Sequence, residues 1–135
     1  MKYYCDTNYI IRYLLGDNEE LFDKTKELFH QAQTGKVLLI IEQTVFTEVV
    51  FVLSSFYKVP KDKIVNVLSE LLVYKGIICE DKEVLLLALN IYAKYNLHIV
   101  DSILAAKAKI HNLPLLSFDS KLMEFHRLSK VSLNE

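Results

Sequence analysis

Short apolar runs rich in β-branched residues alternate along this chain with longer segments of helical periodicity. The run at 37–41 is wholly apolar, which is typical of a strand buried on both faces. Longer segments such as 19–33 place apolar residues on one stripe of a helix. This alternation predicts an α/β fold with a central, mostly parallel sheet of four to five strands, flanked by helices on both faces.

The expected elements follow from the apolar pattern and from the glycines and prolines that interrupt it. Strands are expected at residues 2–5, 37–41, 77–79 and 113–117, with a final edge strand at 130–133. Helices are expected at residues 7–15, 19–33, 44–56, 61–75, 82–95, 101–111 and 121–125. With 135 residues and no linker, composition shift or internal repeat, the chain is expected to form one domain over residues 1–135.

Composition and charge exclude several classes of protein. The formal net charge of −1 gives no general basic field, so nucleic-acid binding would depend on a local patch or on metal ions. Three glycines leave no glycine-rich phosphate loop. The chain has no apolar run near the ~18 residues of a membrane span and no secretory signal, so we expect a cytoplasmic protein without a membrane partner.

Two further features concern the core and its partners. Cys5 and Cys79 lie in short apolar runs and lack the spacing of a zinc site, so we expect buried structural thiols. Hydrophobic residues make up 52% of the chain, which is high for so small a domain. We therefore expect a homodimer face, a partner-protein groove, or both, with the helices at 44–56 and 61–75 as the surfaces.

One carboxylate stands in an unexpectedly apolar segment. Residues 43–57 read QTVFTEVVFVLSSFY, and Glu48 is the only ionisable carboxylate among them. Apolar residues would cover nearly every face of this helix, so we expect it to be buried or pressed against a partner. A buried carboxylate needs a cation or a hydrogen-bond donor, because its desolvation is otherwise too costly.

Three other carboxylates each follow a short apolar run: Asp6 after KYYC, Asp101 after HIV, and Asp119 after PLLSF. Ligands of parallel α/β proteins bind beyond the carboxyl ends of the strands, so Asp6 and Asp119 should point into the same crevice. Each aspartate alone could be a helix N-cap, but capping does not explain Glu48 in mid-helix. Four gathered carboxylates would repel each other unless a divalent cation joined them, and hard oxygen ligands suit Mg²⁺ or Mn²⁺.

These motifs resemble those of the PIN domain, and specifically of VapC-type toxin ribonucleases. The resemblance covers the whole chain: DTN at 6–8, Glu48 in TEVV, Asp101 in DSILAA and Asp119 in LLSFD. Leu104 stands where the family often has isoleucine, a departure that should not affect chemistry. The resemblance implies a PIN-like, 5′-nuclease-like fold and metal-dependent cleavage of RNA.

The chemistry of phosphodiester hydrolysis gives each acid a role. One or two Mg²⁺ ions would lower the pKa of water and neutralise charge on the phosphate. Asp6 and Asp101 are the expected direct ligands. Asp119 is expected to bind a second metal or to act through water. Glu48 is expected to act as a ligand through water or to orient the attacking water.

Supporting residues are less strongly indicated. Polar neighbours that could orient the carboxylates through hydrogen bonds are Thr7, Asn8 and Ser117. Cations that could contact substrate phosphates are Arg12 and Lys121. His98 is a weak candidate for a general acid, because bound metals make one unnecessary.

The leading hypothesis is an endoribonuclease toxin that forms a homodimer and is held inactive by a small antitoxin protein. A housekeeping PIN nuclease in RNA maturation and a non-catalytic PIN module that binds RNA or protein are the alternatives. The complete acid set argues against the non-catalytic module. A phosphatase with an aspartate nucleophile would need D-x-D after the first strand, where this chain has Asn8. The sequence leaves open the RNA target, the cleaved bond, the number of metals, the antitoxin and the oligomeric state.

Overall fold

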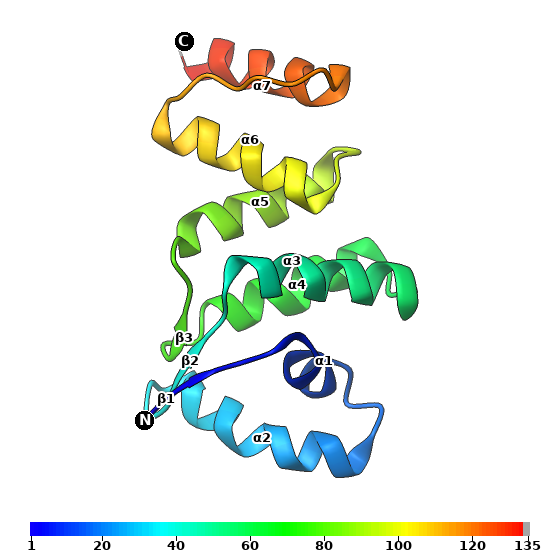
Figure 1. Cartoon of the computed structure of the whole chain (residues 1–135), viewed down its shortest axis with the longest axis vertical. Coiled ribbons are helices and arrows are strands. Elements are labelled where there is room, and N and C mark those ends of the chain that lie inside the picture. Colours follow the sequence, from blue (N-terminus) through cyan, green and yellow to red (C-terminus); the bar gives the residue numbers. More distant parts are fainter. Residues whose placement is uncertain (134–135) are drawn as a thin grey trace. The chain divides into compact units, whose positions relative to one another are not determined.

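The structure is a computed structural model that describes residues 1–133, with side chains as far as residue 129. The chain divides into two compact units, Met1–Lys82 and Glu83–Glu135 (Figure 1). The expectation of one domain over residues 1–135 stays a prediction. Among the described residues, no helix has both the length and the apolar character that crossing a membrane requires.

The N-terminal unit is built around a three-stranded parallel sheet with the order β1–β2–β3. In this sheet Tyr4 pairs with Ile40, and Ile40 pairs with Ile78. The elements of the unit, in chain order, are β1 (Lys2–Tyr4), α1 (Thr7–Leu15), α2 (Glu19–Gln33), β2 (Leu38–Ile40), α3 (Gln43–Phe51), the π-helix η1 (Val52–Phe56), α4 (Lys61–Leu72) and β3 (Ile77–Ile78). Because the strands are parallel, their carboxyl ends meet at one edge, where α1 and α3 begin.

Aromatic packing and helix contacts hold this unit together. The ring of Tyr13 stacks on Phe29, with centroids 4.1 Å apart, and lies 6.0 Å from the ring of Phe22. Helix α1 contacts both α2 and α3. The central strand places Leu39 in the core with no exposed surface. This core fixes the starts of α1 and α3 relative to the sheet.

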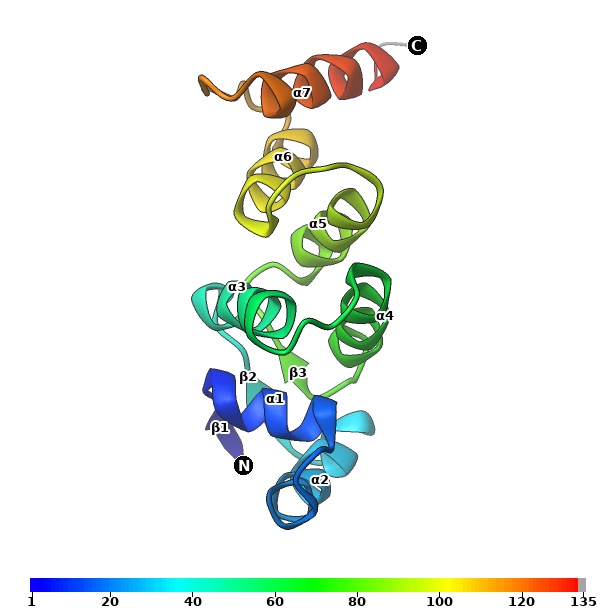
Figure 2. The same cartoon turned by 90° about the vertical axis from the view of Figure 1, so that its right-hand side faces the viewer.

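The C-terminal unit is helical, with α5 (Lys82–Lys94), α6 (Ile99–His111) and α7 (Ser120–Leu133). Helix α6 packs against α7. The segment 112–119 runs back along α6, so that α6 and α7 begin at the same end of the unit (Figures 1 and 2). Two acid-bearing helix starts are therefore brought to one end of this unit.

The α/β class and the parallel sheet flanked by helices are confirmed, but the described residues contain three strands rather than four to five. The segment 113–117 is extended without strand pairing, and the described residues of 130–133 belong to α7. Asn112 ends α6 in the left-handed region (φ 52°), and the amide of Leu113 donates to the Ala108 carbonyl. Pro114 then lacks an amide for a ladder, so this apolar run is not a strand here.

Helix boundaries also differ from the sequence expectations. The expected helix at 44–56 changes after Phe51 into a π-helix, in which the Tyr57 amide donates to the Val52 carbonyl over 3.1 Å. Helix α4 ends at Leu72 rather than 75. The short helix expected at 121–125 is the beginning of the longer α7.

Candidate active site

Asp6 lies just past β1, at the start of α1. Its Oδ1 accepts a hydrogen bond of 2.8 Å from the Tyr9 amide, so Asp6 is the N-cap of α1. The residue is exposed and forms no ion pair with any other described residue. Since capping uses Oδ1, the second carboxylate oxygen remains available to a ligand.

Glu48 lies in α3, which was expected to be apolar on nearly every face, and the structure shows that this helix has an exposed side. Phe46, Val49 and Val50 are buried, whereas Glu48 and Phe51 are exposed. Glu48 therefore carries no desolvation cost that would by itself demand a cation. It belongs to the helix that contacts α1, so both acids of the N-terminal unit lie on neighbouring helices.

Asp101 and Asp119 lie at the starts of α6 and α7. Asp119 caps α7, because its Oδ1 accepts a 3.1 Å hydrogen bond from the Leu122 amide. Asp101 is half-buried in the first turn of α6, whose N-cap is His98, so the capping alternative is wrong for Asp101. The shared end of α6 and α7 places both acids at one end of the C-terminal unit (Figure 1).

The predicted supporting residues have varied surroundings. Ser117 accepts a 2.9 Å hydrogen bond from the Asp119 amide, so it contacts the backbone and not the carboxylate. Thr7 and Asn8 lie in the first turn of α1 and bond to none of the four acids within the described chain.

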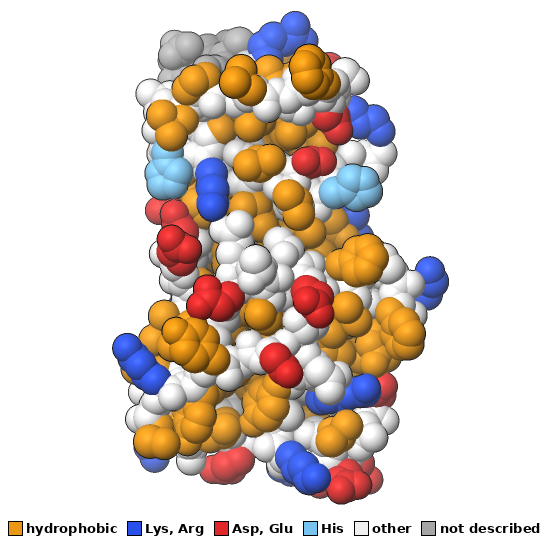
Figure 3. All heavy atoms as spheres, in the orientation of Figure 1, with side chains coloured by type: hydrophobic (Ala, Val, Ile, Leu, Met, Phe, Trp, Pro, Cys, Tyr) orange, Lys and Arg blue, Asp and Glu red, His pale blue; other side chains and the backbone are white. Residues whose placement is uncertain are grey.

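The two predicted phosphate contacts also differ. Arg12 lies in the last turn of α1, where its Nη1 is 3.5 Å from Oδ1 of Asp17. Lys121 is exposed and lies two residues past Asp119. On the face shown in Figure 3, lysine and arginine side chains are scattered rather than gathered, as expected for a net charge of −1.

Glu42 is an acid that the sequence reasoning missed. Asp6 and Glu42 each lie two residues past the paired residues Tyr4 and Ile40. The amide of Cys5 donates to the Ile40 carbonyl over 3.0 Å, which extends the pairing toward both acids. Glu42 is exposed at the N-cap position of α3 and makes no capping hydrogen bond. An acid after a short apolar run was the feature that predicted Asp6, and the run at 37–41 could have identified Glu42 in the same way.

The cysteines contribute no reactive group to this edge. Burial raises the pKa of the Cys5 thiol to about 11, helped by the nearby Asp6 carboxylate. Burial likewise raises the pKa of Cys79 to about 11, against an opposing effect of Lys82. Both thiols are therefore protonated at neutral pH and poor metal ligands. The expectation of a buried thiol is confirmed for Cys5, whereas Cys79 is half-buried.

The donor chemistry of the four predicted acids fits a hard cation. They offer carboxylate oxygens, and none is used in an ion pair between described residues. Mg²⁺ commonly takes one or two carboxylates and keeps several waters, which suits acids near the surface. Within the described chain, however, no three Asp, Glu, His or Cys residues form a group that could hold a metal ion. A centre that combines acids from both units stays a prediction.

Comparison with known proteins gives the family. The family model for the PIN domain matches residues 3–130. Searches of curated proteins and of solved structures found no match. PIN domains are generally nucleases, bind RNA and usually use divalent metals. Because the match spans both units and nearly the whole sequence, this chain belongs to the PIN-domain family.

Proposed function

We propose that this protein is a metal-dependent endoribonuclease that hydrolyses RNA phosphodiester bonds. The observation that carries the proposal is the family match over residues 3–130, which includes all four predicted acids. Their placement adds support, because Asp6, Asp101 and Asp119 each lie at the start of a helix. Carboxylates left without ion-pair partners in the described chain are the groups that a hard cation requires.

In this proposal each acid has a defined task. Bound Mg²⁺ or Mn²⁺ would supply a more acidic water and neutralise the charge that develops on the phosphate. Asp6 and Asp101 would hold the metal directly, and Asp119 would hold a second metal or act through water. Glu48 would act as a ligand through water or orient the attacking water. The capping bonds of Asp6 and Asp119 fix each side chain before metal or RNA arrives.

We further propose that the protein is the toxin of a toxin–antitoxin pair and acts as a homodimer. Two exposed aromatic side chains in the helical segment that follows Glu48 support a protein partner. Phe51 is 65% exposed and Phe56 is 74% exposed, although both continue the apolar segment that starts at Val45. Large exposed apolar side chains that gather in one segment are typical of interaction surfaces.

The experiment combines growth and cleavage assays. Expression of the wild type alone should arrest growth, and the purified chain should cleave RNA with Mg²⁺ but not with EDTA. Asp6→Asn, Asp101→Asn and Glu48→Gln should each lose both effects. Asp62→Asn, a change of an exposed acid in the first turn of α4, is the matched control and should behave as wild type.

The outcomes separate the alternatives. Cleavage in vitro without growth arrest would favour a housekeeping nuclease in RNA maturation. RNA or protein binding without cleavage at any metal concentration would favour a non-catalytic module and end the enzyme proposal. Equal activity of Asp6→Asn and wild type would remove Asp6 from the catalytic group.

A further inference from the structure

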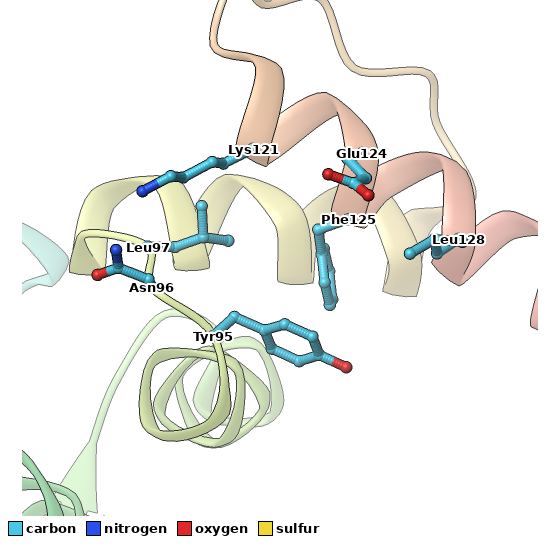
Figure 4. Close-up of a pocket in the computed structure, with 7 residues that line it drawn as sticks. All are labelled: Tyr95, Asn96, Leu97, Lys121, Glu124, Phe125 and Leu128. Atoms are coloured by element: carbon cyan, nitrogen blue, oxygen red, sulfur yellow. The ribbon is translucent and has the colours of Figure 1, made fainter.

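A groove in the C-terminal unit lies between the α5–α6 connection and one face of α7 (Figure 4). Its volume is about 290 Å³, and its walls are mainly apolar. The rings of Tyr95 and Phe125 meet edge to face, with centroids 4.7 Å apart and planes at 68°. Leu97 beside them is buried, whereas Tyr95 is 47% exposed. An aromatic surface therefore remains open to an occupant.

Polar groups are distributed around this apolar centre. Figure 4 shows the Lys121 ammonium and the Asn96 amide at one end of the groove and the Glu124 carboxylate near Phe125. None of the three makes a hydrogen bond or ion pair with another residue in the part of the chain that the structure describes. The groove thus combines a cation, an amide and a carboxylate acceptor around the exposed ring of Tyr95 and the half-buried ring of Phe125.

The groove lies near the starts of α6 and α7, the helix starts that carry both acids of its unit. Lys121 follows Asp119 by two residues, and Leu97 precedes Asp101 by four. Helices α6 and α7 begin at the same end of the unit, so these neighbours in sequence are also gathered in space (Figures 1 and 2). A molecule in the groove would lie near the helix starts that carry Asp101 and Asp119, although neither acid lines the groove itself.

We propose that this groove binds one unpaired base of single-stranded RNA, with a flanking phosphate on Lys121. This inference rests on the proposed function and extends it to the substrate. Bases stack on aromatic side chains whatever their identity. Glu124, near Phe125, would accept a hydrogen bond from the edge of the base, and Asn96 lies with Lys121 at the end assigned to the phosphate. The volume argues against a partner helix, because about 290 Å³ is near the lower limit for a small-molecule site.

Binding is tested on the full-length chain in EDTA, so that cleavage does not interfere. The probe is a fluorescently labelled single-stranded RNA of mixed sequence, followed by anisotropy, with oligo(A) and oligo(U) as further arms. Phe125→Leu should weaken binding about tenfold through lost stacking, without changing the salt dependence. Lys121→Gln should weaken binding and lower the slope of log affinity against log salt by about 0.7, as expected for one lost phosphate contact.

Matched controls separate this groove from general effects. Arg127→Gln removes an exposed cation from the same helix, outside the groove, and should leave the salt slope unchanged. Phe125→Tyr keeps the ring and should retain binding. Lys121 is exposed, so Lys121→Gln decides the question if Phe125→Leu does not fold.

The proposal is overturned if Phe125→Leu and Lys121→Gln bind RNA as the wild type does. Unchanged RNA affinity with lost binding to an antitoxin protein would assign the groove to a peptide. If the wild-type chain binds RNA but shows no nuclease activity, and Phe125→Leu and Lys121→Gln lose that binding, the base site is supported and the proposed enzymatic function is not.

Discussion

Asp6 and Asp119 illustrate how one carboxylate can serve structure and chemistry through different atoms. In each residue Oδ1 accepts a backbone hydrogen bond at the start of a helix. The other oxygen is free for a metal ion, and the negative charge belongs to the whole carboxylate. Asparagine keeps the capping acceptor but loses the charge, so substitution can separate the two roles.

Two changes at Asp6 make this separation measurable. Asp6→Asn should change the free energy of unfolding by less than about 0.5 kcal/mol, whereas Asp6→Ala should cost about 1 kcal/mol through the lost cap. Both variants should lose RNA cleavage. Urea denaturation of the metal-free chain provides the free energies. Equal destabilisation by the two changes would show that capping by Oδ1 contributes little.

Glu42 offers a second comparison between single residues. Its charge lies at the strand end next to that of Asp6, so Glu42→Gln should lower the affinity for Mg²⁺ severalfold by removing local negative charge. It makes no capping bond, so stability without metal should not fall. Calorimetric Mg²⁺ titration measures the change, with Glu70→Gln in α4 as control. Unchanged affinity would leave Glu42 outside the centre.

At the scale of helices and strands, the apolar pattern predicted most of the elements. The three described strands lie where short apolar runs were found, and α2 has the predicted bounds 19–33. The pattern was wrong about Glu48, because the number of apolar residues in 43–57 hid the exposed side of α3. Total hydrophobicity does not show how residues are distributed around a helix.

The run at 113–117 shows a second limit of the pattern. Its LPLLS sequence carries the same signal as a strand, yet Leu116 is 94% exposed. Strand formation depends on an available partner edge, which no local sequence reports. The acids at element starts, Glu42 included, were identifiable from the sequence, whereas the pairing of β1 with β2 that places Glu42 beside Asp6 was not.

Gly76, just before β3, lies close to the backbone of the segment that contains Val37 and Leu39. Its carbonyl accepts from the Leu39 amide over 2.7 Å, and a Cβ there would lie 2.1 Å from the Val37 carbonyl oxygen. Gly76→Ala should therefore destabilise the N-terminal unit by more than about 2 kcal/mol. Gly35→Ala, where φ is +86° but a Cβ meets only an ordinary contact, should cost about 1 kcal/mol. Urea melts should give this order, and the reverse order would contradict the close approach.

At the scale of the whole molecule, the four predicted acids are divided between the two units, with Asp6 and Glu48 in one and Asp101 and Asp119 in the other. Metal that binds only the folded chain raises the melting temperature, by a few degrees at tenfold excess over its dissociation constant. Asp6→Asn and Asp101→Asn should each abolish the Mg²⁺-induced rise, although they lie in different units. Differential scanning calorimetry with and without Mg²⁺ measures this rise in melting temperature. Loss in only one variant would show that the units do not share a metal.

The buried thiol of Cys5 and the half-buried thiol of Cys79 have a practical consequence for following local opening. Cys5 and Cys79 both lie in the unit Met1–Lys82, and Glu83–Glu135 has no cysteine. The pKa of each thiol is higher in the folded chain than in the unfolded chain, so the folded chain holds the proton more tightly. Folding stability should therefore fall as pH rises from about 9 towards 11. Near neutral pH, alkylation by iodoacetamide should be slow in the native chain and fast in urea. Mass spectrometry of the alkylated chain would then report the rate at which the sheet opens. It would not report motions of α6 and α7.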